Sequence, residues 1–238
     1  MSFKLDLHVH SQFRGHTYIT AEKLKEALTK RRLDGVAITN FFDISHAVLL
    51  KEQLKEFIVI VGQEIWTKEG HLIGLGLNEK LPDFKSAEET IGEIHNQGGI
   101  AIAPHPYLNL GLGKKIMSLP LDAIESYNGI IGASLIYNFL AMMSARKKNI
   151  PQTASTDTTS PAFVGKSYTE VLVDDPKLIL EAIRSGNVKP RKRALPLPVA
   201  FILKNFLNFK NIKPCPLHAV ACSVCGASMA VRIFKRKL

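Results

Sequence analysis

The sequence is poor in cysteine, which argues against a body stabilised by disulfide bonds. All three cysteines among the 238 residues fall at or after position 215. A cysteine-free body suits a reducing cytosol, so we expect a cytoplasmic protein. The first apolar residues are interrupted by Lys4 and Asp6, unlike those of a signal peptide. The uncharged run 217–231 is shorter than the roughly 20 residues of a membrane span, so we expect no transmembrane segment.

Acidic residues are missing from the C-terminal part of the chain. Residues 189–238 contain 11 Lys and Arg and no Asp or Glu, whereas residues 1–188 contain 20 Lys and Arg against 21 Asp and Glu. The body therefore carries a charge of −1, and the net charge of +10 comes from the extension. This shift predicts two parts, a body of residues 1–188 and a basic extension of residues 189–238.

Short β-branched and apolar runs recur along the body and predict strands separated mostly by helices. They lie at residues 3–10, 36–39, 57–61, 72–75, 100–103, 123–127, 153–155 and 169–173. Helices are expected after the N-cap Thr20, after Ser86 with its capping-box partner Glu89, and over residues 132–147 and 176–185. The alternation predicts an α/β fold with a parallel sheet, and about seven repeats favour a barrel over an open sheet.

The first strand carries two histidines on one face. Residues 3–10 read FKLDLHVH, in which apolar residues alternate with polar ones, so His8 and His10 point the same way. Neighbours on one face lie about 7 Å apart, which lets two imidazoles bind one metal ion. The alternative is a surface strand with two incidental histidines.

Further polar residues follow the later strands. In a parallel barrel the C-terminal ends of all strands meet at one mouth, where active sites form. Five potential metal ligands, spread over about 150 positions, would then converge, namely His8, His10, Glu64, His105 and Asp157. Such a mixed nitrogen and oxygen donor set suits Zn²⁺, Mn²⁺ or Fe²⁺. Taken one at a time, each residue is equally explained as a solvated side chain at the start of a loop.

These residues stand in motifs that resemble those of the polymerase and histidinol phosphatase (PHP) family. The motifs follow the family's order and comprise residues 6–11 (DLHVHS), 35–40 (GVAITN), 62–64 (GQE), 71–77 (HLIGLGL), 103–106 (APHP), 125–129 (ESYNG) and 155–157 (STD) with Gly165. Together they span residue 3 to about residue 188. The resemblance implies a distorted (β/α)7 barrel that holds up to three metal ions at its mouth and hydrolyses phosphoesters.

The resemblance also implies a role for individual residues. His8, His10, Glu64 and Asp157 match the ligands of a first ion. Glu64 would bridge to a second ion, which His105 would also hold. Polar residues near further ligand positions are candidates for metal or substrate contact, namely His16, Asn40 and Asn128.

Two motifs depart from the family's pattern. Its second motif ends Thr-Asp-His, where this chain has Thr-Asn-Phe at residues 39–41. Its last motif ends Ser-Asp-Ala-His, where this chain has TDTT at residues 156–159. Phe41 and Thr159 thus replace two histidine ligands, and a third ion would lack donors. We therefore predict one or two divalent ions, with Zn, Mn and Fe as the candidates.

The basic extension has three alternative explanations. It contains an amphipathic stretch at residues 200–209 and the uncharged run 217–231, which predict two helices that pack on the barrel. Alternatively, the extension binds an anionic lipid surface or nucleic acid. The third alternative is a metal site made of Cys215, His218, Cys222 and Cys225.

The resemblance to the PHP family and the retained donors predict a metal-dependent phosphoesterase that acts on a small phosphorylated substrate, either a phosphomonoester or a small phosphodiester. A metal-activated water would attack the phosphorus, and Arg14, His16 or Lys166 could bind the phosphate as cations. The alternative is a catalytically eroded barrel that binds nucleic acid through residues 189–238. The retained donors favour the enzyme, whereas Phe41, Thr159 and the basic extension favour the binding protein.

Overall fold

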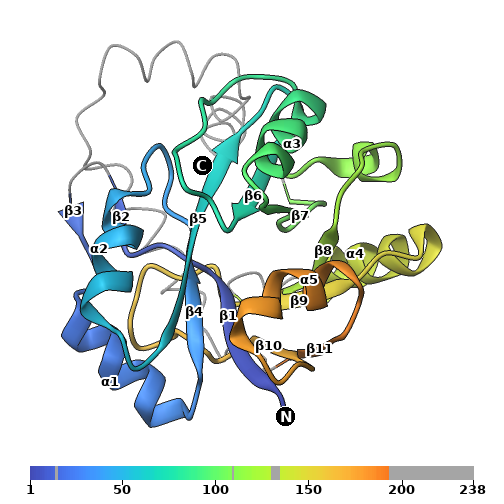
Figure 1. Cartoon of the computed structure of the whole chain (residues 1–238). Helices are drawn as coiled ribbons and strands as arrows, with labels where there is room; N and C mark the ends of the chain where they lie inside the picture. Colours follow the sequence, from blue (N-terminus) through green and yellow to red (C-terminus); the bar gives the residue numbers. More distant parts are fainter. Residues whose placement is uncertain (14–15, 109, 130–134, 193–238) are drawn as a thin grey trace, which may run out of the picture. The chain divides into compact units, whose positions relative to one another are not determined.

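A computed structural model describes residues 1–13, 16–108, 110–129 and 135–192 (Figure 1). Its strands are β1 (Phe3–Val9), β2 (Gln12–Phe13), β3 (His16–Thr17), β4 (Gly35–Ile38), β5 (Ile58–Trp66), β6 (His71–Leu75), β7 (Ile100–Ala103), β8 (Ala123–Asn128), β9 (Gln152–Ser155), β10 (Tyr168–Val171) and β11 (Val188–Arg191). Its helices are α1 (Ala21–Arg31), α2 (Ser45–Gln53), α3 (Ala87–Asn96), α4 (Leu135–Lys148) and α5 (Ile179–Arg184), with 3₁₀ helices η1 (Gly113–Met117) and η2 (Pro176–Leu178).

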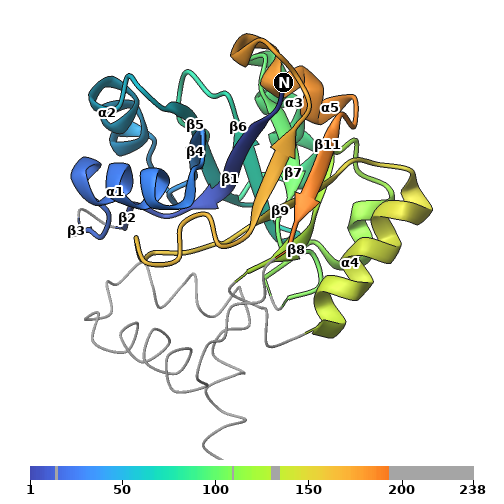
Figure 2. The same ribbon diagram turned by 90° about the horizontal axis from the view of Figure 1, so that it is seen from below.

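Nine strands of the described residues form one sheet in the order β11-β10-β1-β4-β5-β6-β7-β8-β9. The sheet curls until its edges approach each other, since β9 contacts β1, β10 and β11 (Figure 2). Asp157 donates its backbone N–H to the carbonyl of His8 at 2.8 Å, and His10 donates to the carbonyl of Thr158 at 2.9 Å. These bonds join the chain after β9 to β1. The predicted α/β barrel is confirmed as a nearly closed, barrel-shaped sheet.

The prediction of a parallel sheet is wrong for part of the barrel. β6 runs antiparallel to β5 and β7, β10 is antiparallel to β1, and β11 is antiparallel to β10. Residues 67–70 alone separate β5 from β6. Because a parallel crossover needs a dozen or more residues, so short a link forces an antiparallel hairpin.

The predicted helix starts at Thr20 and Ser86 are confirmed. Thr20 accepts the backbone N–H of Lys23 at the start of α1, and Ser86 and Glu89 make both bonds of a capping box at the start of α3. The helix expected over residues 132–147 is α4, and the one expected over 176–185 is η2 followed by α5. Helices α2, α3 and α4 contact β5, β7 and β8 respectively.

The apolar residues of β1 pack in two different hydrophobic clusters. Leu5 and Leu7 are buried with apolar residues of β6, β7 and α5, whereas Val9 packs with residues of α1 and α2.

No helix of the described residues is long and apolar enough to cross a membrane. β11 crosses the predicted boundary at residue 188, so the sheet continues to Arg191. Residues 193–238 of the basic extension lie outside the described residues, and its helices and its three alternatives stay predictions.

Candidate metal centre

Four side chains from three parts of the barrel converge on one point. His8 and His10 come from the end of β1, Glu64 from β5, and Asp157 from the loop after β9, and one ligand atom of each lies within 4.8 Å of the others. His8 Nε2 lies 3.2 Å from His10 Nε2, 3.1 Å from Glu64 Oε2 and 3.3 Å from Asp157 Oδ1. His10 Nε2 lies 2.9 Å from Glu64 Oε2 and 3.4 Å from Asp157 Oδ1.

Glu64 belongs also to a second cluster, with His71 and His105. Its other carboxylate oxygen, Oε1, lies 2.7 Å from His71 Nδ1 and 3.1 Å from His105 Nε2. His105 Nε2 lies 3.9 Å from Asp157 Oδ2. The carboxylate of Glu64 thus faces His8 and His10 with Oε2 and His71 and His105 with Oε1. Glu64 is almost completely buried between the two pairs.

His71 is a site residue that was not predicted from the sequence. The predicted site residues follow the C-terminal ends of strands, but β6 runs antiparallel, so its first residue lies at the same end of the barrel. His71 pairs there with Trp66, the last residue of β5. The expectation that Glu64 ends its strand is wrong for the same reason, because the hairpin extends β5 by two further residues. The short 67–70 link was the signal that could have placed His71.

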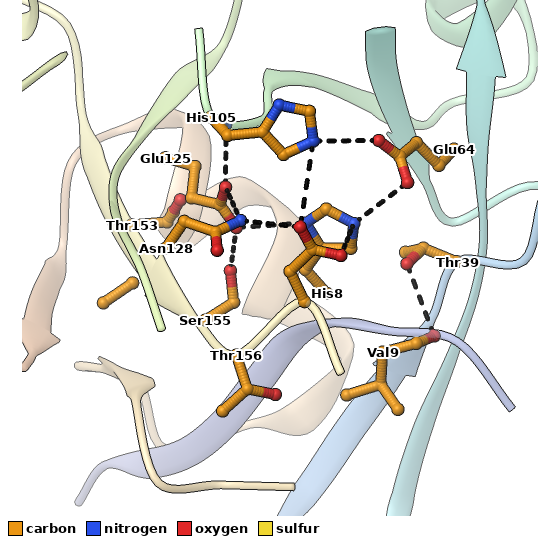
Figure 3. A network of polar contacts seen from close by, with 12 residues as sticks. His8, Val9, Thr39, Glu64, His105, Glu125, Asn128, Thr153, Ser155 and Thr156 are labelled. Atoms are coloured by element: carbon orange, nitrogen blue, oxygen red, sulfur yellow. Dashed lines mark hydrogen bonds and ion pairs between the residues drawn. The ribbon is translucent and has the colours of Figure 1, made fainter. Parts of the chain in front are cut away.

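A second missed residue, Glu125 of β8, connects the donors to the barrel wall (Figure 3). Its carboxylate accepts from His8 Nδ1 at 3.1 Å, from the backbone N–H of His105 at 2.8 Å and from Asn128 Nδ2 at 2.9 Å. The hydroxyl of Ser155 donates to it as well. Because a carboxylate only accepts, Glu125 favours a proton on Nδ1 of His8, and with a metal ion bound Nε2 would be the nitrogen that offers its lone pair.

The cluster perturbs the ionisation of its own members. Burial disfavours the imidazolium of His8, but the charges of Asp157, Glu64 and Glu125 outweigh burial and raise the pKa of His8 well above its ordinary value. Burial is likewise outweighed at Asp157, where His8, His10 and His105 lower the pKa to about 2. Without a metal, a buried set of this kind needs bound protons to balance its carboxylates.

The donor set fits a divalent metal ion in its distances and in its chemistry. A tetrahedral Zn²⁺ with ligands at 2.0–2.1 Å has neighbouring donors about 3.4 Å apart, and the five separations in the first cluster that involve a histidine run from 2.9 to 3.4 Å. Each of the four histidines presents one ring nitrogen to the carboxylate of Glu64. Such a mixed set of nitrogen and oxygen donors suits a divalent ion.

The backbone at two donors is held in a sparsely populated conformation. His105 has φ +27° and Asp157 has φ +52°, although neither is glycine. Asp6, buried beneath the Asp157 loop, accepts from the backbone N–H and the hydroxyl of Thr156 and from the N–H of Gly165. Burial raises the pKa of Asp6 to about 6 despite these bonds. Strained residues at a site are retained where the surrounding structure fixes the position of a side chain.

Comparison with known proteins places the chain in a family. The family model described as "PHP-associated" matches residues 136–188. The uncharacterized protein MJ1587 of Methanocaldococcus jannaschii is 37% identical over 165 residues, which cover 63% of this chain and 95% of the relative. The chain belongs to the PHP family.

Solved structures share the PHP barrel at low sequence identity. PsfC of Pseudomonas syringae has a TM-score of 0.62 at 13% identity, covering 88% of this chain and 98% of its own. Endonuclease Q in complex with duplex DNA bearing an abasic lesion has a TM-score of 0.54 at 15% identity, covering 79% and 56%. A Bifidobacterium adolescentis protein assigned as a metal-dependent phosphoesterase has a TM-score of 0.50 at 13% identity, covering 66% and 88%.

Phe41 and Asn40, in the second PHP motif, no longer offer a ligand to the cluster. Phe41 stacks on the ring of His10 with centroids 4.7 Å apart and planes 17° apart. The amide oxygen of Asn40 accepts the backbone N–H groups of Ser11 and Gln12 at 2.8 and 3.0 Å. Asn40 therefore fixes the loop after β1, which is a structural role different from the expected metal or substrate contact.

The remaining predicted residues lie in different surroundings. Asn128 donates to Asp157 Oδ2 at 3.0 Å, so it contacts a donor of the first cluster. His16 is exposed on β3 and is in neither cluster. Lys166 Nζ lies 4.4 Å above the ring of Phe163. Arg14 lies outside the described residues. Phosphate binding by Arg14, His16 and Lys166 stays a prediction.

Proposed function

We propose that this chain is a metal-dependent phosphoesterase, a hydrolase that acts on a phosphomonoester or a small phosphodiester. The observation that supports this most is the sharing of Glu64 between two clusters of buried donors. His8, His10, Glu64 and Asp157 would hold one divalent ion, and Glu64, His71 and His105 would hold a second. Zn, Mn and Fe all suit this donor set.

The residues around the donors would contribute to catalysis by holding the donors in place. When bound, two divalent ions supply Lewis-acid activation of water and neutralise charge on the phosphoryl group. Glu125 keeps the proton of His8 on Nδ1, which leaves Nε2 free as a donor. Asn128, a neutral amide, holds Asp157 through Oδ2 without adding charge. The side chain of Asp157 is 16% exposed, whereas those of the other three donors are almost fully buried, so substrate would approach from its side.

The relatives support this proposal in general terms. The B. adolescentis protein is assigned as a metal-dependent phosphoesterase, and endonuclease Q is solved with a DNA duplex. Both names describe enzymes that hydrolyse phosphoester bonds. Paired divalent ions are well suited to catalyse that reaction. The retained donors, which still form two clusters, do not favour the alternative of an eroded barrel that only binds nucleic acid.

Release of phosphate from generic esters, measured with and without added Mn²⁺, Zn²⁺ or Fe²⁺, tests the proposal. We expect metal-stimulated hydrolysis by the full chain. Glu64→Gln and His10→Ala should lower it by about a hundredfold or more, since even residues that only support ligands cost 10–100-fold, while circular dichroism remains unchanged. Glu52→Gln, at an exposed position of α2, is the matched control. A purified protein without bound metal and without metal-stimulated hydrolysis would contradict the proposal.

A further inference from the structure

A cluster of aromatic side chains runs from the metal centre to the surface. The ring of Trp66 lies 5.2 Å from that of His71, and the ring of Phe84 lies 6.2 Å from that of Trp66 at an angle of 74°. Phe42 flanks the same indole at 5.9 Å. Trp66 is half-buried and Phe84 is 44% exposed. The donors of the second cluster are thus connected to solvent through two ring-to-ring steps.

Packing alone does not account for this aromatic cluster. Phe42 and Phe84 have φ +65° and +66°, a left-handed conformation that is strained for a bulky residue. The loop that carries Phe84 is held against Trp66, because Trp66 donates its backbone N–H to Asp83 at 2.8 Å and accepts that of Phe84 at 2.5 Å. Trp66 Nε1 is buried and has no hydrogen-bond partner among the residues that the structure describes. Two strained phenylalanines and an unsatisfied indole are costly, and the exposed ring of Phe84 gains little from burial.

The geometry points to a binding subsite for a nucleobase, formed by Trp66 and Phe84 beside the metal centre. This inference rests on the proposed function, because it takes the phosphoryl group to lie at the metal centre. A nucleotide carries a phosphate at one end and a flat aromatic heterocycle at the other, which matches a metal centre next to exposed rings. Any nucleobase can stack on an aromatic side chain, because every nucleobase has a π face.

The fluorescence of Trp66 reports directly on this subsite, because the chain contains a single tryptophan. The full chain loaded with Zn²⁺ is titrated with adenosine monophosphate and, separately, with ribose 5-phosphate, which lacks the base. We expect saturable quenching by the nucleotide and none by the sugar phosphate. A 5′-phosphorylated thymidine oligonucleotide forms a second arm. Affinity equal to or above that of the mononucleotide indicates a strand end as the ligand, and weaker affinity indicates a free nucleotide.

Phe84→Gly separates a binding role from a structural one. Removal of the ring should weaken nucleotide binding about tenfold. The melting temperature should be unchanged or higher, because glycine adopts φ +66° without strain. Phe84→Leu keeps an apolar side chain without a π face and should also weaken binding. The control is Phe139→Ala, a 55% exposed residue of α4, which should bind as wild type does.

Equal responses to the nucleotide and the sugar phosphate, or unchanged affinity in Phe84→Gly, would overturn the inference. If metal-stimulated hydrolysis is still observed in that case, the proposed function stands and only the nucleobase subsite fails. If the nucleotide quenches Trp66 and Phe84→Gly abolishes this, but no ester is hydrolysed, the subsite stands and the proposed function fails.

Discussion

At the scale of single residues, the site consists of donors and of the groups that hold them. Glu125 touches four partners, from β1, the loop after β7, β8 and β9, and contributes no atom to either donor cluster. Its position beside His8 is typical of a carboxylate that fixes the orientation and tautomer of a metal-binding histidine. Its role is therefore positioning rather than ligation.

Glu125→Gln should lower metal affinity about 10–100-fold while leaving every ligand in place. The amide of glutamine presents a donor where His8, His105 and Asn128 already donate, so one of them loses its acceptor. Competition with a fluorescent chelator measures the affinity, and circular dichroism checks the fold. Glu64→Gln provides the comparison, because loss of a shared ligand should abolish binding at both clusters. Wild-type affinity in Glu125→Gln would show that Glu125 does not position His8.

The sequence predicted the donors that stand in recognisable motifs and missed those that depend on strand direction. The alternation in β1 was sufficient to place His8 and His10 on one face. His71 could not be assigned, because its place at the barrel mouth depends on the antiparallel course of β6. Glu125 lies in the middle of an apolar run, and nothing in that run shows which neighbours a carboxylate would meet.

At the scale of elements, the loop after β1 is held by α2 and by the chain after β4. The hydroxyl of Ser11 lies 2.7 Å from Nδ1 of His46, near the start of α2, and 3.1 Å from Nδ2 of Asn40. Burial lowers the pKa of His46, although Asp43 opposes this. The folded state thus favours a neutral His46 that accepts the proton of Ser11.

This arrangement predicts a loss of stability on acidification. Because the pKa of His46 is lower in the folded than in the unfolded chain, unfolding takes up a proton as the pH falls below about 6.5. The contribution of His46 is fully present above that pH and is lost as the pH falls through the folded-state pKa. His46→Gln keeps an acceptor for Ser11 and does not titrate. The melting temperature of metal-free wild type should therefore fall further between pH 7.5 and 5 than that of the variant, and parallel curves would contradict this.

The elements themselves could be predicted better than their pairing. Capping residues and apolar spacing located α1 and α3, because those signals are local. The order of strands in the sheet and the direction of β6, β10 and β11 depend on link lengths and on contacts between distant segments. β11 spans the change in charge that marked a boundary in composition, and its residues pair with β10.

At the scale of the whole molecule, the donor clusters connect segments from different parts of the barrel-shaped sheet. Residues from β1, β5, β6 and the loops after β1, β7 and β9 meet there, and residues after β9 close the sheet onto β1. A ligand that binds this folded arrangement and not the unfolded chain stabilises the whole barrel.

Bound metal should therefore raise the melting temperature. At a free metal concentration 100 times the Kd, the gain is about 2.7 kcal/mol, or roughly 5–10 °C for a domain of this size. Differential scanning fluorimetry before and after chelation measures the shift, and Glu64→Gln should show none. Equal melting temperatures for metal-loaded and chelated wild type would contradict binding at the folded site.

The central claim is that distant imidazoles and carboxylates form one centre for divalent metal ions. Anomalous diffraction from crystals of the full chain grown with Mn²⁺ tests it most directly. We predict one peak bounded by His8, His10, Glu64 and Asp157, with a second between Glu64, His71 and His105. Fully occupied Mn²⁺ elsewhere, with no peak at either cluster, would contradict the account.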